Sequence, residues 1–215
     1  MSKRSGRRRG FKKRRKLQPK IKRYGPLYRV PFRRRREMKT DYQQRKRLLK
    51  SGKIRFIARP SNKQVLVQFV ESKIGGDQTF IQVRSNELKN HGWDVATSNL
   101  PAAYLTGYLA GKKALKSKIK EAILDVGTFA VNPGTRMFAT LKGVVDAGIE
   151  IPYNEKMIPS EDRIKGKHIQ TYAKLLAKED KEKYNKVFSK YLEVNKKPEN
   201  LPALFDEVKA KIDTL

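Results

Sequence analysis

Four consecutive arginines, Arg33 to Arg36, are the group in this chain whose chemistry is easiest to name. A guanidinium stays charged at physiological pH, and its paired N–H donors match the oxygens of a phosphate. On an extended chain, successive side chains project to opposite sides and can bridge two phosphate backbones or fill a deep groove. The four arginines therefore predict contact with a nucleic acid.

Aromatic residues lie beside these arginines, at Tyr28, Phe32 and Tyr42. They can stack on unpaired bases, an interaction worth about 1–3 kcal/mol per base. They can equally pack on the folded domain as ordinary apolar side chains. The sequence leaves both interpretations open.

A second group of polar residues follows at the start of the folded domain. Residues 54–60 read as a strand, on which Arg55 and Arg59 share one face. We expect these two arginines to carry the cationic surface onto the sheet. Asn62 and Lys63 would border that surface in the turn after the strand.

The distribution of charge supports a polyanionic partner. Twenty-five of the 51 Lys and Arg residues lie in the first 55 positions, where Glu37 and Asp41 are the only acids. The whole chain carries a formal charge of +30 and a pI of about 10.4. Self-repulsion and a shortage of apolar surface oppose collapse of such a segment. A counterion-release mechanism predicts a loss of about 10³–10⁵ in affinity between 50 and 200 mM salt.

Composition argues against several other classes of protein. Glycines and prolines interrupt the N-terminal arginines, which disfavours an amphipathic membrane-surface helix. No apolar stretch is long enough to span a bilayer, and no apolar core follows the basic N-terminus as a secretory signal requires. Without cysteine, disulfides and thiolate metal sites are excluded, and two histidines are too few for a histidine metal cage.

The basic segment divides into three predicted parts. Residues 1–23 are expected to be disordered in the free protein, and residues 24–39 to stay extended because of Pro26 and Pro31. A basic helix is expected from Thr40, capped by Thr40 or Asp41 and ended by Gly52.

The rest of the chain alternates strand and helix patterns. Strands are predicted at 54–60, 64–71 and 79–85 as a meander, and a buried strand at 121–127. A short helix capped by Ser85 should follow the third strand. Longer helices are predicted from Asn99 to about Ser117, across 137–148, and in three segments between 169 and 212.

These elements predict an α/β fold with three regions. They are a basic arm at 1–53, an α/β core at 54–152 and a helical region at 153–215. Gly107 and Gly111 resemble a small-xxx-small membrane motif, but Lys112 and Lys113 follow directly. Close packing of this helix against a strand is the expectation.

Two alternative functions fit parts of the sequence. Asp125, Asp146 and the turn at 133–136 would suit an enzyme acting on RNA or on a phosphorylated substrate. No histidine, cysteine or glycine-rich phosphate loop accompanies them, so we expect no enzyme and no cofactor. A non-specific, chromatin-like condensing protein driven by residues 1–53 is the other alternative.

Several longer motifs resemble the universal large-subunit ribosomal protein family that binds 5S ribosomal RNA, number eighteen in universal naming. The matching segments are YRVPFRRRRE at 28–37, KTDY at 39–42, RLLKSGK at 47–53, RPSNKQVLVQ at 59–68, NLPAAYLTGYLAGKKA at 99–114, ILDVG at 123–127, FATLKGVVDAGIEIPYNE at 138–155 and GKHIQTYAKLL at 166–176. The short connection before Asp125 is similar to the archaeal branch.

This resemblance implies an α/β/α core with a mixed sheet, seated on 5S ribosomal RNA in the central protuberance of a cytoplasmic large subunit. It also implies contacts with neighbouring ribosomal proteins and no membrane. By motif, the RNA-binding residues are Arg29, Arg33, Arg34, Arg35, Arg36, Lys39, Thr40, Tyr42, Arg45, Lys50, Ser51, Lys53, Arg55, Arg59, Asn62 and Lys63, with Asn99 and Lys142 as weaker candidates. Residues 1–23 depart from the family pattern. Their charge predicts that they thread along large-subunit (23S-type) ribosomal RNA and become ordered on assembly.

Overall fold

The computed structural model describes residue 25 and residues 29–214. The predicted disorder of residues 1–23 and the stacking of Tyr28 lie outside this range. Among the described residues, every helix is too short or too polar to cross a bilayer.

Four strands form one mixed sheet in the order β3-β2-β1-β4. Their bounds are Arg55–Pro60 for β1, Val65–Lys73 for β2, Gly76–Arg84 for β3 and Ile123–Asp125 for β4. β1 and β2 are antiparallel, as are β2 and β3, whereas β1 and β4 are parallel. The predicted meander and the α/β class with a mixed sheet are confirmed.

The strand expected at 121–127 is shorter than predicted, and all three residues of β4 are only partly buried. β4 has a single neighbour, β1, because it lies at the edge of the sheet. An edge strand is covered less completely than a central one. The apolar run at 121–127 marked the strand correctly but overstated its burial.

Two helices cover one face of the sheet: α3, Leu100–Lys116, and α4, Arg136–Asp146. A Cβ placed on Gly107 would lie 2.1 Å from the Thr140 carbonyl oxygen, and one on Gly143 would lie 2.2 Å from the Tyr104 carbonyl oxygen. These glycines allow the two helix backbones to touch. The close packing expected at Gly107 is therefore present, but its partner is a helix instead of a strand.

The C-terminal region is helical, as predicted. Its elements are α5 at Glu161–Ile164, α6 at Lys167–Glu179, α7 at Lys181–Val187, α8 at Ser189–Glu193 and α9 at Leu201–Asp213. Short 3-10 turns lie at Ser85–His91 (η1), Glu155–Met157 (η2) and Pro198–Asn200 (η3). α9 returns to α3, where the rings of Phe205 and Tyr104 lie 5.4 Å apart between centroids. Phe205, Val208 and Ile212 thereby join the same hydrophobic core as the sheet.

Ser85 does not cap the short helix that follows β3. It is the first residue of η1, and its hydroxyl accepts from the Val65 N–H at 3.0 Å. The backbone N–H of Arg84, the residue before η1, donates to Glu87 at 2.9 Å. The predicted serine cap is therefore wrong, because the Ser85 hydroxyl bonds the backbone of β2 and not an N–H group of η1.

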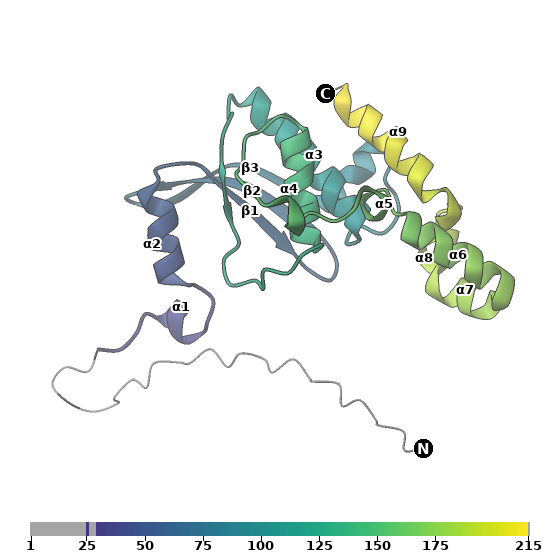
Figure 1. Cartoon of the computed structure of the whole chain (residues 1–215), viewed down its shortest axis with the longest axis horizontal. Helices are drawn as coiled ribbons and strands as arrows, with labels where there is room; N and C mark the ends of the chain where they lie inside the picture. Colours follow the sequence, from purple (N-terminus) through teal and green to yellow (C-terminus); the bar gives the residue numbers. More distant parts are fainter. Residues whose placement is uncertain (1–24, 26–28, 215) are drawn as a thin grey trace, which may run out of the picture.

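Two helices precede the sheet: α1, Arg33–Arg36, and α2, Tyr42–Lys50. Figure 1 shows both at one end of the long axis of the molecule, with α6, α7 and α8 at the other. Asp41 caps α2 by accepting from the N–H groups of Gln43 and Gln44, at 3.0 and 3.2 Å. α2 and its Asp41 cap are thus confirmed.

Candidate nucleic-acid interface

The four consecutive arginines form a helical turn, so the expectation of an extended chain at Arg33–Arg36 is wrong. The N–H of Arg36 donates to the Phe32 carbonyl at 3.0 Å, which closes the turn directly after Pro31. Proline interrupts a helix that would have to pass through it, but it is compatible with a helix that begins after it in the chain. The guanidiniums therefore spread around a helix axis, about 100° apart, instead of alternating between two sides.

Two of these guanidiniums hold the arm together. Arg33 Nε donates to Glu37 Oε1 at 2.8 Å, and Arg34 Nε donates to the Thr40 hydroxyl at 2.8 Å. In the described part of the chain, Arg35 and Arg36 are exposed and pair with no carboxylate. These two are the arginines of the run with a full set of free donors.

Glu37 stays ionised within this cluster. Hydrogen bonds from Lys39 and then Arg33 lower the pKa of its carboxyl. The Lys39 ammonium lies 2.8 Å from Glu37 Oε2. Glu37 thus orients two neighbouring cations and leaves the net charge of the arm strongly positive.

The aromatic residues of the arm contact one another. The rings of Phe32 and Tyr42 lie 5.1 Å apart between centroids, tilted by 45°. This pair holds α1 against the start of α2. Of the two interpretations of these aromatic residues, the structure shows packing, but Phe32 and Tyr42 pack on each other within the arm and not on the folded domain. Phe32 remains 70 % exposed, so base stacking on its outer face stays a prediction.

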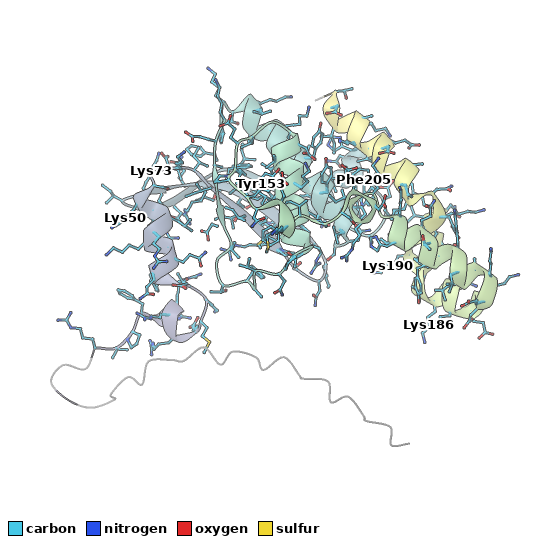
Figure 2. All side chains as sticks on the ribbon, in the orientation of Figure 1. Lys50, Lys73, Tyr153, Lys186, Lys190 and Phe205 are labelled. Atoms are coloured by element: carbon cyan, nitrogen blue, oxygen red, sulfur yellow. The ribbon has the colours of Figure 1, made fainter. Side chains whose placement is uncertain are left out.

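α2 presents its cations to solvent. Among residues 29–214, Lys46, Arg47 and Lys50 are exposed and form no ion pair. Figure 2 shows Lys50 and Lys73 at the α2 end of the molecule, far from Lys186 and Lys190. The end of the molecule that carries α1 and α2 is therefore strongly cationic.

Arg55 is buried, with 2 % of its surface exposed, so its predicted place on the open face is wrong. Its Nη1 donates to Asp125 Oδ2 at 2.9 Å, and its Nη2 lies 2.7 Å from Asp77 Oδ2. The reason is topological: β4, which lies next to β1, brings Asp125 to this side chain, and Asp77 reaches it from the start of β3, beyond β2. Its Nε is buried and has no hydrogen-bond partner among the residues that the structure describes. Arg55 therefore links strands of the sheet, and its side chain is not accessible to a ligand.

Asp77 joins this buried arginine to the arm. It accepts from Arg45 Nη2 of α2 at 2.7 Å and from the Ser72 hydroxyl at 2.8 Å, in addition to Arg55. Burial alone would raise the pKa of Asp77, but the bonds from Arg45, Arg55 and Ser72 outweigh burial and hold the pKa well below its usual range. The bond to Asp77 likewise raises the pKa of Arg45. One carboxylate therefore ties α2 to the sheet.

The connection from α2 to β1 is also fixed. The Ser51 hydroxyl donates to the Leu48 carbonyl at 2.6 Å, and the Lys53 N–H donates to the Ser51 oxygen at 3.3 Å. The Lys53 ammonium pairs with Glu121. Ser51 thus acts on the backbone, while Lys53 is exposed and already has an anionic neighbour.

Asn62 and Lys63 lie in a turn that other segments hold rigid. The Ser98 hydroxyl and Arg136 Nη1 both donate to the Ser61 carbonyl, at 2.8 and 2.7 Å. The Thr97 hydroxyl donates to the Lys63 carbonyl at 2.9 Å. The side chains of Asn62 and Lys63 are exposed, as is Arg59 at the end of β1. This turn follows the opposite end of β1 from the arm, so the predicted residues form two separate groups.

Arg136 was missed as a positioning residue. The sequence at 133–136 is compatible with a turn at a helix start that could hold a phosphate, without a separate role for the Arg136 side chain. Here the guanidinium of Arg136 also donates to the Ser98 carbonyl at 2.9 Å. The signal that could have indicated this role is a basic residue that directly follows a turn in the chain.

The two weaker candidates lie elsewhere. Asn99 caps α3 by accepting from the Ala102 N–H at 2.9 Å, and its amide donates to the Tyr191 hydroxyl at 3.3 Å. Lys142 pairs with Asp146 at 2.7 Å on α4. Both side chains are engaged within the fold, and the structure does not bring them to the arm.

The two carboxylates considered for catalysis have separate partners. Asp125 accepts from Arg55, whereas Asp146 accepts from the Tyr104 hydroxyl at 2.8 Å and pairs with Lys142. Each stabilises contacts between secondary-structure elements.

The fold and the charge distribution define a basic α/β protein whose net positive charge, within the described residues, is densest in the segment that carries α1 and α2. A family model described as "Ribosomal large subunit proteins 60S L5, and 50S L18" matches residues 26–121. The chain belongs to this family of large-subunit ribosomal proteins and resembles its archaeal members.

Two archaeal relatives carry the name large ribosomal subunit protein uL18. That of Methanothermobacter thermautotrophicus is 47 % identical over 190 residues, which span 88 % of this chain and 97 % of the relative. That of Aeropyrum pernix is 48 % identical over 190 residues, 88 % of this chain and 89 % of the relative.

Proposed function

We propose that this protein binds 5S ribosomal RNA and anchors it in the central protuberance, with the arm also contacting large-subunit (23S-type) ribosomal RNA. By family it is a structural large-subunit ribosomal protein of the cytoplasmic ribosome, a class distinct from enzymes. Neighbouring ribosomal proteins of the protuberance are its further proposed partners.

The observation that carries the proposal is the surplus of cations in α1 and α2. Residues 29–53 contain 11 Lys and Arg against two acids. Glu37 is already bonded by Arg33 and Lys39, and Asp41 caps α2. These cations repel one another until they pair with the phosphates of a polyanion, which then releases its condensed counterions to the solvent. Folded RNA supplies phosphates at that density.

We assign different roles within the predicted residues. Direct contacts are proposed for exposed cations and polar groups of the arm and of the turn after β1, namely Arg29, Arg35, Arg36, Lys50, Arg59, Asn62 and Lys63. A second set is proposed both to contact the RNA and to position other groups, because each of its side chains has a partner in the fold. These residues are Arg33, Arg34, Lys39, Thr40, Tyr42, Arg45, Ser51 and Lys53. Arg55 is proposed to act only through Asp77 and Arg45.

The test is a filter-binding titration with 5S ribosomal RNA and with an unrelated RNA of the same length. We expect tighter binding to 5S RNA at moderate salt, because charge alone makes no distinction between the two. Removal of residues 1–53 should leave weaker but measurable 5S binding through the turn after β1. Equal affinity for both RNAs at moderate salt would refute the proposal and favour the condensing protein.

A further inference from the structure

A hollow of about 790 Å³ lies beside the arm, on the body of the protein. It is bounded by the α2–β1 connection, by Phe80 of β3 and by the α3–β4 connection, with lining residues 51–54, 80 and 117–121. Its volume falls in the range of about 300–1,000 Å³ that is usual for small-ligand sites.

An aromatic ring lines this hollow at an irregularity in β3. Phe69 pairs with Ile81 and Val70 pairs with Thr79, so Phe80 is an extra residue in the ladder. Such a bulge redirects a side chain. Phe80 is 47 % exposed, whereas Ile81 next to it is 8 % exposed. The sheet thus turns a large planar group out of the core.

A lysine in an unusual backbone conformation also lines the hollow. Lys118 has φ of +60° in the residue position after α3 where glycine is common. The N–H of Lys118 donates to the Leu115 carbonyl at 2.9 Å, and that of Ile119 donates to the Ala114 carbonyl at 3.0 Å. This is a Schellman ending with lysine in place of glycine, so a charged side chain extends from a helix end that usually bears none.

The cations of the hollow exceed its acids. Lys118 and Lys120 are exposed on either side of Ile119, which is 7 % exposed and anchors the connection in the core. Within the described residues, neither lysine pairs with a carboxylate. Lys53 takes the only acid of the lining, Glu121. The hollow therefore combines one free aromatic face with two free ammonium groups.

We propose that this hollow binds a single unpaired nucleotide of 5S ribosomal RNA. The base stacks on Phe80, and the flanking phosphate lies between Lys118 and Lys120. The inference rests on the proposed function. It extends the interface beyond the arm, since Ser51 and Lys53 connect α2 to the hollow directly. An acidic protein segment would use the two lysines, but it does not need an exposed planar ring in the same hollow.

Two variants of the full chain distinguish the proposed contact with the base from the proposed contact with the phosphate. Phe80→Leu keeps an apolar group but removes the planar face, so 5S affinity should fall about 5- to 150-fold with an unchanged salt slope. Lys118→Gly with Lys120→Gln should lower the salt slope by about one unit, because both lysines contact the same phosphate. Glycine suits the backbone at 118, so thermal unfolding of this variant should be preserved. The matched control, Lys186→Gln with Lys190→Gln, removes the same charge at the opposite end and should leave 5S binding unchanged (Figure 2).

The outcomes are distinguishable from failure of the proposed function. If wild-type protein does not prefer 5S RNA, the proposed function itself is wrong. If wild-type protein prefers 5S RNA and both variants match the control, the nucleotide site is wrong. If the variants keep full 5S affinity but fail to enter large subunits, the hollow binds a protein instead, which also overturns the inference.

Discussion

The two ends of this molecule are rich in basic residues but differ in how that charge is balanced. Residues 29–53 contain 11 basic and two acidic residues, whereas residues 153–214 contain 14 basic and 11 acidic residues. At the C-terminal end, Lys167 pairs with Asp162 and Lys112 of α3 pairs with Asp213 of α9. We therefore propose that the shortage of acids around the lysines and arginines, and not their number, distinguishes the RNA-binding end.

The largest expected effect is loss of the whole arginine turn. Replacing Arg33 to Arg36 with alanine should reduce the salt slope of 5S binding by about three units and block incorporation into large subunits. The matched control removes four lysines from the other end, with glutamine at Lys181, Lys183, Lys186 and Lys190. Both variants are titrated with 5S RNA in increasing KCl. If the control weakens binding as much as the arginine variant, the contrast between the two ends is wrong.

The next effect concerns the link between arm and body. Asp77→Ala leaves the buried Arg55 with Asp125 as its remaining carboxylate and frees Arg45 of α2. We expect a loss of about 2–4 kcal/mol in the free energy of unfolding, measured by urea denaturation. The control is Glu71→Ala in the same hairpin, which breaks an exposed pair with Lys73 and should cost less than about 1 kcal/mol. Equal losses in the two variants would contradict the role of Asp77.

The same carboxylate predicts a dependence on pH. The pKa of Asp77 is lowered in the folded protein from an ordinary value of 3.8. Its contribution to stability is therefore complete above about pH 4 and is lost as the pH falls from there through the lower folded-state pKa. The difference in thermal midpoint between wild type and Asp77→Asn should be constant from pH 7 to pH 4 and should shrink below it. A difference that persists unchanged at pH 2.5 would show that the ionised carboxylate is not responsible.

The smallest expected effect comes from one cation. Arg36→Ala should weaken 5S binding modestly and lower the salt slope by about one unit. Arg33→Ala should have a comparable slope effect and also release Glu37, so thermal unfolding of the two variants is compared in parallel. An unchanged slope for Arg36→Ala would remove this residue from the interface.

Local patterns predicted most of the secondary structure. Alternation marked β1, β2 and β3, and helical spacing marked α3, α4 and the C-terminal helices. Asp41 before a basic run indicated the start of α2. These signals work because they depend on neighbours in the chain. The division into residues 1–53, 54–152 and 153–215 stays a prediction.

Long-range pairing explains what the sequence did not reveal. Arg55 looked like a surface cation because it alternates with apolar residues, but its acceptor Asp125 lies 70 residues further along. The helical turn at Arg33–Arg36 depends on local backbone bonds and on the contact of Phe32 with Tyr42, ten residues apart. The split of the candidate residues between the arm and the turn after β1 required the strand order.

Residue-resolved protection of arginines against phenylglyoxal tests the central claim most directly. The reagent modifies free guanidiniums, and mass spectrometry reports each site with and without 5S RNA. Arg35 and Arg36 should be modified at least about tenfold more slowly in the complex, in proportion to occupancy of the site. Arg163, which is exposed in the C-terminal region, should react at the same rate in both. Equal rates at Arg35 and Arg36 with and without saturating 5S RNA would contradict the account.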